Sequence, residues 1–177
     1  MTAIGLYQSV LSASLVFTVR RFPITIPVMK IAVMLHLFGV VVWVGGMFFA
    51  YMALRPAAAQ LLEPPQRLAL WSATLERFFR WVWIAAALVL GSGFYMLSVI
   101  VQSTRLPLYV YAMLYIGVAM TLIFAYVVFS PHAALRGAVA AADWKAGAAA
   151  LNRIRIAVAV NLGLGLANIV IATVGAM

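Results

Sequence analysis

The chain has 177 residues, of which 67% are apolar and only 8% are charged, with a formal net charge of +9. This composition excludes an ordinary soluble domain, in which about a quarter of the residues are charged. The basic residues separate apolar stretches, as side chains at phospholipid headgroups do, so we expect a lipid bilayer and no nucleic acid as partner. The absence of cysteine excludes disulfides and thiolate metal sites.

Four stretches contain no Asp, Glu, Lys or Arg, and they are residues 31–54, 81–104, 106–135 and 156–177. Each exceeds the roughly 20 apolar residues that cross a bilayer as a helix. Backbone groups in lipid need internal partners, which leaves helices or a closed barrel, and barrel strands would alternate polar and apolar residues. The sequence therefore predicts an all-α polytopic membrane protein, an antiparallel bundle of four transmembrane helices.

Residues 1–28 precede this strong pattern and are diluted by Gln, Ser and Thr. We expect this N-terminal extension to be either a surface-lying amphipathic segment or an artefact of the gene model, with translation starting at Met29. Residues 29–177 form one membrane domain, with helices expected over about 29–54, 78–101, 107–130 and 154–176. Pro56 and Pro131 are expected to end the first and third helices, because proline lacks the N–H that a helix interior needs.

The charges predict the orientation. With four spans, the connections between helices 1 and 2 and between helices 3 and 4 share one side, and they carry eight of the twelve basic residues. Basic residues are retained in the cytoplasm. We therefore expect a multi-pass protein of the bacterial inner (plasma) membrane with both termini on the extracytoplasmic side.

His36 lies in the outer third of the first helix, where an ionisable side chain indicates a functional site. At helical spacing it shares a face with Gly39, Trp43, Gly46 and Met47. The two glycines allow another helix to approach, so this face is expected to point into the bundle. His36 is then either a metal or haem ligand, or a hydrogen-bonding group that only joins helices. His132, at the opposite end of helix 3, is expected to be an interfacial residue in a connection.

Met113 on helix 3 matches His36 in depth, and a thioether suits copper(I), while His and Met together also serve as axial haem ligands. We predict His36 and Met113 as metal ligands, with Tyr111 and Met47 as weaker candidates. Asn161, Gly165 and Asn168 form a stripe on helix 4 that is expected to serve packing, as are Gly39, Trp43 and Gly46.

No acidic residue lies within a span, and no phosphate-binding loop or nucleophile–base pair is present. We expect no catalytic residues and no enzymatic activity. The one enzymatic alternative is a haem-linked oxidoreductase.

The first span, LHLFGVVVWVGGM over residues 35–47, resembles the first helix of the CopD-like membrane proteins. Further similarities are RFFRW at 77–81, FSP at 129–131, DW at 143–144 and LNRIR at 151–155, so the resemblance runs from Met29 to about Asn168. It implies a four-helix fold and an association with copper uptake or resistance.

A more distant likeness is to the haem-dependent protoporphyrinogen oxidase of bacteria, whose haem-linked histidine would correspond to His36. The His-x-Lys pattern of its third helix would fall on Tyr111 and Met113, so the lysine is missing. This departure argues against oxidase activity and leaves binding of haem b possible.

We therefore expect an inner-membrane protein that binds, transports or gives resistance to copper through a His/Met site on the extracytoplasmic side. One alternative is a b-type haem protein that transfers electrons. The other is a non-catalytic accessory subunit with a membrane partner. A homodimer is also expected to be feasible, because four helices are narrow for a transport path.

Overall fold

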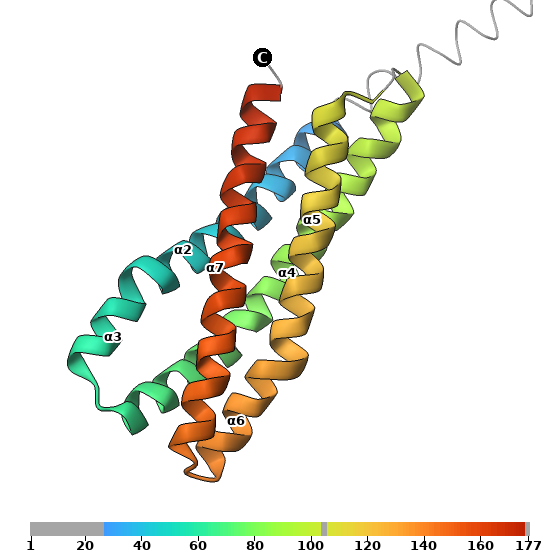
Figure 1. Cartoon of the computed structure of the whole chain (residues 1–177). Helices are drawn as coiled ribbons and strands as arrows, with labels where there is room; N and C mark the ends of the chain where they lie inside the picture. Colours follow the sequence, from blue (N-terminus) through green and yellow to red (C-terminus); the bar gives the residue numbers. More distant parts are fainter. Residues whose placement is uncertain (1–26, 104–105, 176–177) are drawn as a thin grey trace, which may run out of the picture.

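The structure, a computed structural model, describes residues 27–103 and 106–175. Nearly all of the predicted extension, residues 1–28, lies outside these ranges. The described part contains no strand and has four helices that are long and apolar enough to cross a membrane: Pro27–Leu61, Pro64–Gln102, Leu108–Ala140 and Trp144–Gly175 (Figure 1). The predicted all-α polytopic bundle is confirmed.

Two of the four helices, the first and the third, consist of several helical elements. Beyond residues 27–40, the first membrane helix consists of η1 (Val41–Gly45), α2 (Gly46–Phe49), η2 (Ala50–Leu54) and α3 (Arg55–Leu61), where η denotes a π-helical turn. The second is α4 (Pro64–Ser103). The third consists of α5 (Leu108–Val127), η3 (Val128–His132) and α6 (Ala133–Ala140), and the fourth is α7 (Trp144–Gly175).

The helices continue past both prolines that the sequence predicts as ends. Pro56 follows the π-turn η2 and occupies the first turn of α3, where no N–H is needed. Pro131 lies inside η3, and the wider π-turn accommodates a residue that cannot donate a hydrogen bond. The predicted helix ends at Pro56 and Pro131 are therefore both wrong. Only Leu62 and Glu63 are non-helical between the first two membrane helices.

Figure 1 shows α7 running beside α5 and α6, and these elements pack closely along their lengths. The first membrane helix packs on α4 near Gly39, where a Cβ atom would lie 2.8 Å from the carbonyl oxygen of Ala85. Its later part diverges from α7, and α3 is its element farthest from α7 (Figure 1).

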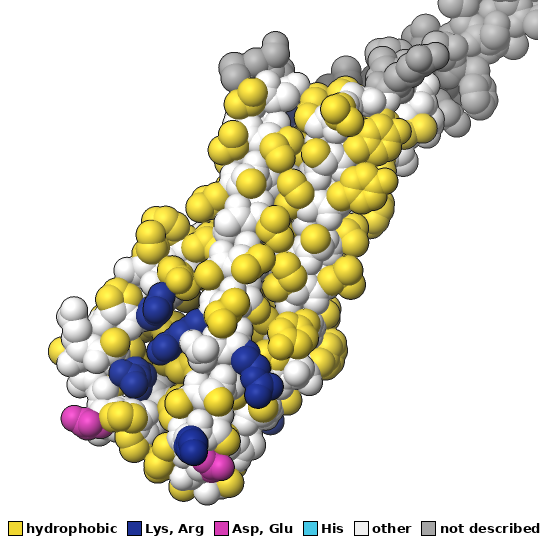
Figure 2. All heavy atoms as spheres, viewed as in Figure 1, with side chains coloured by type: hydrophobic (Ala, Val, Ile, Leu, Met, Phe, Trp, Pro, Cys, Tyr) yellow, Lys and Arg dark blue, Asp and Glu magenta, His cyan; other side chains and the backbone are white. Residues whose placement is uncertain are grey.

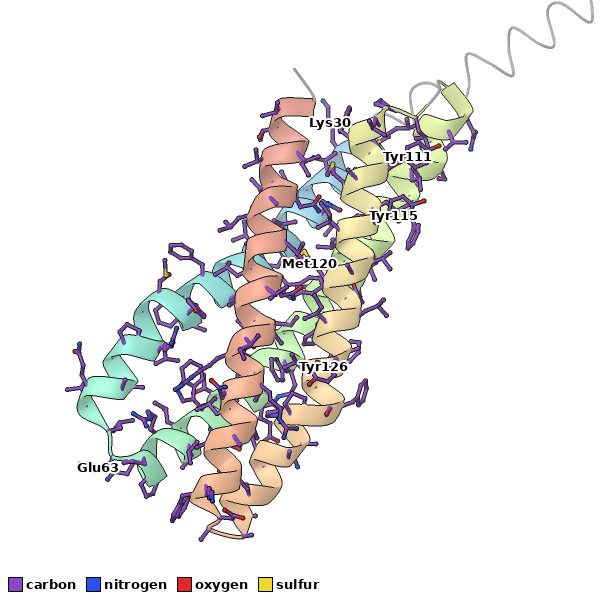
Figure 3. The ribbon with its side chains drawn as sticks, viewed as in Figure 1. Lys30, Glu63, Tyr111, Tyr115, Met120 and Tyr126 are labelled. Carbon is purple, nitrogen blue, oxygen red and sulfur yellow. The ribbon has the colours of Figure 1, made fainter. Side chains whose placement is uncertain are left out.

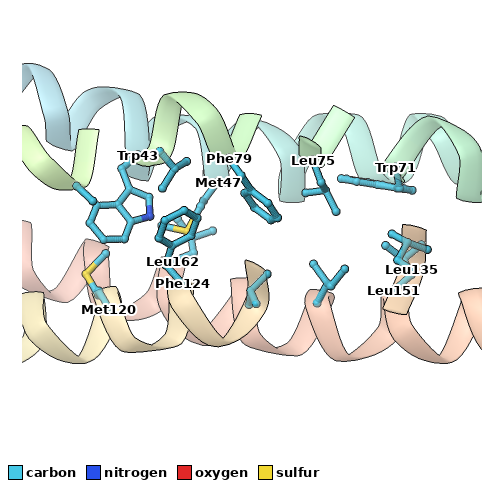
Figure 4. Close-up of a cluster of buried hydrophobic side chains, with 14 of the residues drawn as sticks. Trp43, Met47, Trp71, Leu75, Phe79, Met120, Phe124, Leu135, Leu151 and Leu162 are labelled. Carbon is cyan, nitrogen blue, oxygen red and sulfur yellow. The ribbon is translucent and has the colours of Figure 1, made fainter. Parts of the chain in front are cut away.

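Aromatic rings form the centre of the core (Figure 4). The Phe124 ring meets the rings of Trp43 and Phe79 edge-on, with centroid distances of 5.8 and 5.6 Å. Such edge-to-face pairs contribute about 0.5–1.5 kcal/mol beyond their buried area. They join the first membrane helix, α4 and α5.

Charged side chains gather at the end of the bundle that holds the α3–α4 and α6–α7 connections, and the rest of the visible face is mostly hydrophobic (Figure 2). This separation is expected of a multi-pass membrane protein whose charged end meets the headgroups.

Candidate functional site

His36 is half-buried where the first membrane helix meets α4. Its Nδ1 atom lies 3.1 Å from the hydroxyl oxygen of Ser92 on α4. The Ser92 hydroxyl is buried and donates to the carbonyl of Leu88, with the carbonyl oxygen of Val89 at 3.3 Å. This back-bonding to the preceding turn is a common arrangement of serine in helices, and it fixes where the hydroxyl oxygen points.

These contacts favour one tautomer of His36. A hydroxyl has one hydrogen, and that of Ser92 points to the backbone. Its oxygen can then accept a hydrogen bond from Nδ1–H of the imidazole, which favours the neutral ring with its lone pair on Nε2. Metal-binding histidines commonly have their second ring nitrogen held by such a hydrogen bond.

Gly93 provides the surface against which the imidazole packs. A Cβ atom at Gly93 would lie 3.4 Å from Cε1 and 3.6 Å from Nδ1 of His36. Because Gly39 lets the same two helices approach closely one turn further on, His36 is held at a helix–helix interface.

Met113 is half-buried on α5. Val44 and Met120 both pack against Gly165 of α7, at 2.9 and 3.2 Å from where its Cβ would lie, so these two residues share a depth. His36 precedes Val44 by eight residues and Met113 precedes Met120 by seven, which is about 12 and 10.5 Å of rise along two helices that run in the same direction. The count along each helix gives similar positions, and the pairing of His36 and Met113 as ligands stays a prediction.

The two weaker candidates have different surroundings. The Tyr111 side chain is 41% exposed, and Tyr115 one turn later is 70% exposed, so both lie on the outer side of α5 (Figure 3). Met47 is buried in the core, and its sulfur accepts a hydrogen bond of 3.7 Å from Nδ2 of Asn161.

The residues predicted to serve packing lie between helices. A Cβ atom at Gly46 would collide with the Phe78 ring of α4, and Gly165 contacts Val44 and Met120. Asn161 is buried and joins α7 to the first membrane helix through Met47. Asn168 is half-buried, and its Oδ1 has no hydrogen-bond partner among the described residues.

The sequence predicts His132 in a connection at the membrane interface. In the structure it is buried within η3 instead. It is 5% exposed and its ring meets Phe79 edge-on at 4.9 Å. The reason is the continuation of the helix through Pro131, which carries His132 into the α4–α6 contact. Phe79 and Ser92 are separated by about 20 Å along α4, so one ion cannot bind both histidines.

A pocket lined by two arginines, Arg55 and Arg155, was not predicted. A third arginine, Arg67, interacts electrostatically with Arg155. The sequence places all three near helix ends on the basic side, but their convergence depends on three different helices.

Among the described residues, no group of three or more His, Cys, Asp or Glu side chains could hold a metal ion. A metal site in this part of the chain would therefore need other donors, such as thioethers.

The family model described as copper resistance protein D, CopD, matches residues 72–175, which is more than half of the chain. The match begins within α4 and runs to the end of α7, so the span that contains His36 lies before it. It supports the CopD resemblance and does not support the likeness to the haem-dependent oxidase. No curated protein matches the chain. No solved structure matches it either.

Proposed function

Because this chain belongs to the copper resistance protein D family, we propose that it is a non-enzymatic inner-membrane protein that binds copper and takes part in copper uptake or resistance. Two observations support this proposal. One is the family membership, and the other is the His36 imidazole, whose Nδ1 atom is hydrogen-bonded to the Ser92 hydroxyl. The site would lie on the extracytoplasmic side, as the bias of basic residues toward the other end of the bundle favours.

In this proposal the Nε2 atom of His36 and the thioether of Met113 bind Cu(I) together. Imidazole and thioether donors suit copper, and their matching depth is what a shared ion requires. Met47 is a less suitable donor because its sulfur accepts from Asn161, and Tyr111 is less suitable because it is exposed on the outer side of α5.

Cu(I) titration of the detergent-purified protein under reducing conditions, in competition with a chromophoric chelator, tests this proposal. We expect His36→Ala to lose the high-affinity site and Met113→Leu to weaken it. His132→Ala and Met52→Leu are the matched controls, since His132 lies at the other end of the bundle and Met52 is exposed.

Parent-like copper affinity in His36→Ala would show that His36 is not a ligand. A parent protein that does not bind Cu(I) would overturn the proposed function itself. An absorption spectrum of the same sample adds a separate outcome, because a Soret band after expression with added haem would favour the haem-protein alternative.

A further inference from the structure

A pocket lies between the later part of the first membrane helix, α4, α5 and α7. Its walls are mostly apolar, with side chains such as Leu75, Val82 and Ile154. Tyr51, Arg55 and Arg155 form a polar part of its lining. Figure 2 shows Lys and Arg side chains gathered in the hollow between α3 and α7, on the charged end of the bundle.

No acidic side chain in the described part of the chain pairs with the three arginines at this place. Arg55 and Arg67 each act on the guanidinium of Arg155 as like charges, and all three side chains are half-buried. Among the described residues none of them forms an ion pair or a hydrogen bond, although Arg55 lies over the Tyr51 ring at 4.8 Å. Converging like charges repel strongly where water is scarce. An anion bound between the three guanidinium groups would attract each of them and offset this repulsion.

Unsatisfied hydrogen-bonding atoms surround the same space. The Nε atoms of Arg67 and Arg155 are buried and have no hydrogen-bond partner in the described part of the chain. Trp71 is 6% exposed and lines the pocket, and its indole Nε1–H also lacks a partner among these residues. A buried indole N–H normally finds an acceptor. All three atoms are donors, so the groups that would satisfy them are acceptors such as phosphate oxygens.

We infer that this pocket binds an anionic phospholipid, with the phosphate at Arg55, Arg67 and Arg155 and part of an acyl chain against the apolar walls. Arginine matches phosphate oxygens in geometry and charge, and a phosphate is the anion that every headgroup layer supplies. The apolar walls favour a lipid over free phosphate, because a phosphate ion has no acyl chain to pack against them. The inference does not depend on copper binding.

Native mass spectrometry of the full chain, released from nanodiscs that contain equal amounts of phosphatidylglycerol and phosphatidylcholine, measures the retained lipid. The test variant is Arg55→Gln/Arg67→Gln/Arg155→Gln. The matched control is Arg77→Gln/Arg80→Gln/Arg153→Gln, which removes the same charge at three exposed positions. We expect the parent and the control to retain phosphatidylglycerol, and the test variant to lose it by about tenfold or more, since charge-assisted hydrogen bonds to phosphate are strong.

Equal loss in both triple variants would mean general surface attraction and would overturn the inference, as would parent-like retention in the test variant. Inorganic phosphate in the millimolar range is a separate arm. If it displaces the lipid and stabilises the lipid-free protein against heat as well as phosphatidylglycerol does, the site binds free phosphate and the lipid assignment is wrong.

A single substitution serves if the triple variant does not fold. Trp71→Phe keeps an aromatic ring in the pocket wall and removes only the Nε1–H donor. We expect it to retain several-fold less phosphatidylglycerol than Trp81→Phe, an exposed control on the same helix. Equal retention in the two variants would contradict the proposed headgroup position.

Discussion

Valine at position 46 is expected to lower the thermal stability of the protein strongly. A Cβ atom there collides with the ring of Phe78, and valine adds two further methyl groups in the same place. Forcing extra methyl groups into a packed contact costs about 1–3 kcal/mol. Helices in a membrane associate through close packing and not through the hydrophobic effect, so a collision in this contact directly weakens the association of the first membrane helix with α4. Thermal unfolding of the detergent-purified variant measures the effect.

The neighbouring residue provides the control. A Cβ atom at Gly45 meets nothing within 4 Å, so Gly45→Val changes the helix backbone in the same way without a collision. We expect Gly45→Val to unfold within a few degrees of the parent. If both variants lose stability equally, the need for glycine lies in the π-helical backbone and not in the contact with Phe78.

A double-mutant cycle makes the assignment specific. Truncating Phe78 to alanine in the Gly46→Val background opens the space that valine needs. The two substitutions should therefore be less destabilising together than the sum of their separate effects. Strict additivity would contradict the proposed collision.

The second large effect is expected at Ser92 and rests on the proposed copper site. Ser92→Ala removes the oxygen that accepts from Nδ1–H of His36 and should weaken Cu(I) binding by about 10–100-fold, the usual cost of losing the group that orients a histidine ligand. Chelator competition measures the affinity. Thermal unfolding should change little, because alanine fits the space of serine.

Two further variants test whether the loss of the Ser92 hydroxyl weakens Cu(I) binding because this hydroxyl positions His36 or whether the loss of any hydroxyl on α4 has the same effect. Ser92→Thr keeps a hydroxyl that can bond to the preceding turn, so we expect it to retain most of the affinity. Ser98→Ala removes an equivalent hydroxyl, bonded to the carbonyl of Tyr95 on the exposed side of α4, and should bind copper like the parent. Parent-like affinity in Ser92→Ala would show that this hydroxyl does not orient the ligand.

Helix ends were the least predictable part of the fold. Pro56 and Pro131 each lack an N–H, and local chemistry alone predicts a stop at both. The structure places a π-turn next to one and around the other, so the helices continue and His132 becomes buried. Such turns depend on packing around the proline, which no local pattern describes.

The sequence by itself determined the number and type of the spans, because the thickness of the hydrocarbon core sets the length of an uncharged stretch and lipid forbids unpaired backbone groups. It also indicated that the face of Gly39 and Gly46 meets another helix, since only a close approach requires two missing side chains there. The partner of that face was decided by the tertiary structure, which brings α4 with Ser92 against His36. The arginine cluster was decided there too, because Arg55, Arg67 and Arg155 lie on three different helices and only the packing of these helices brings them together.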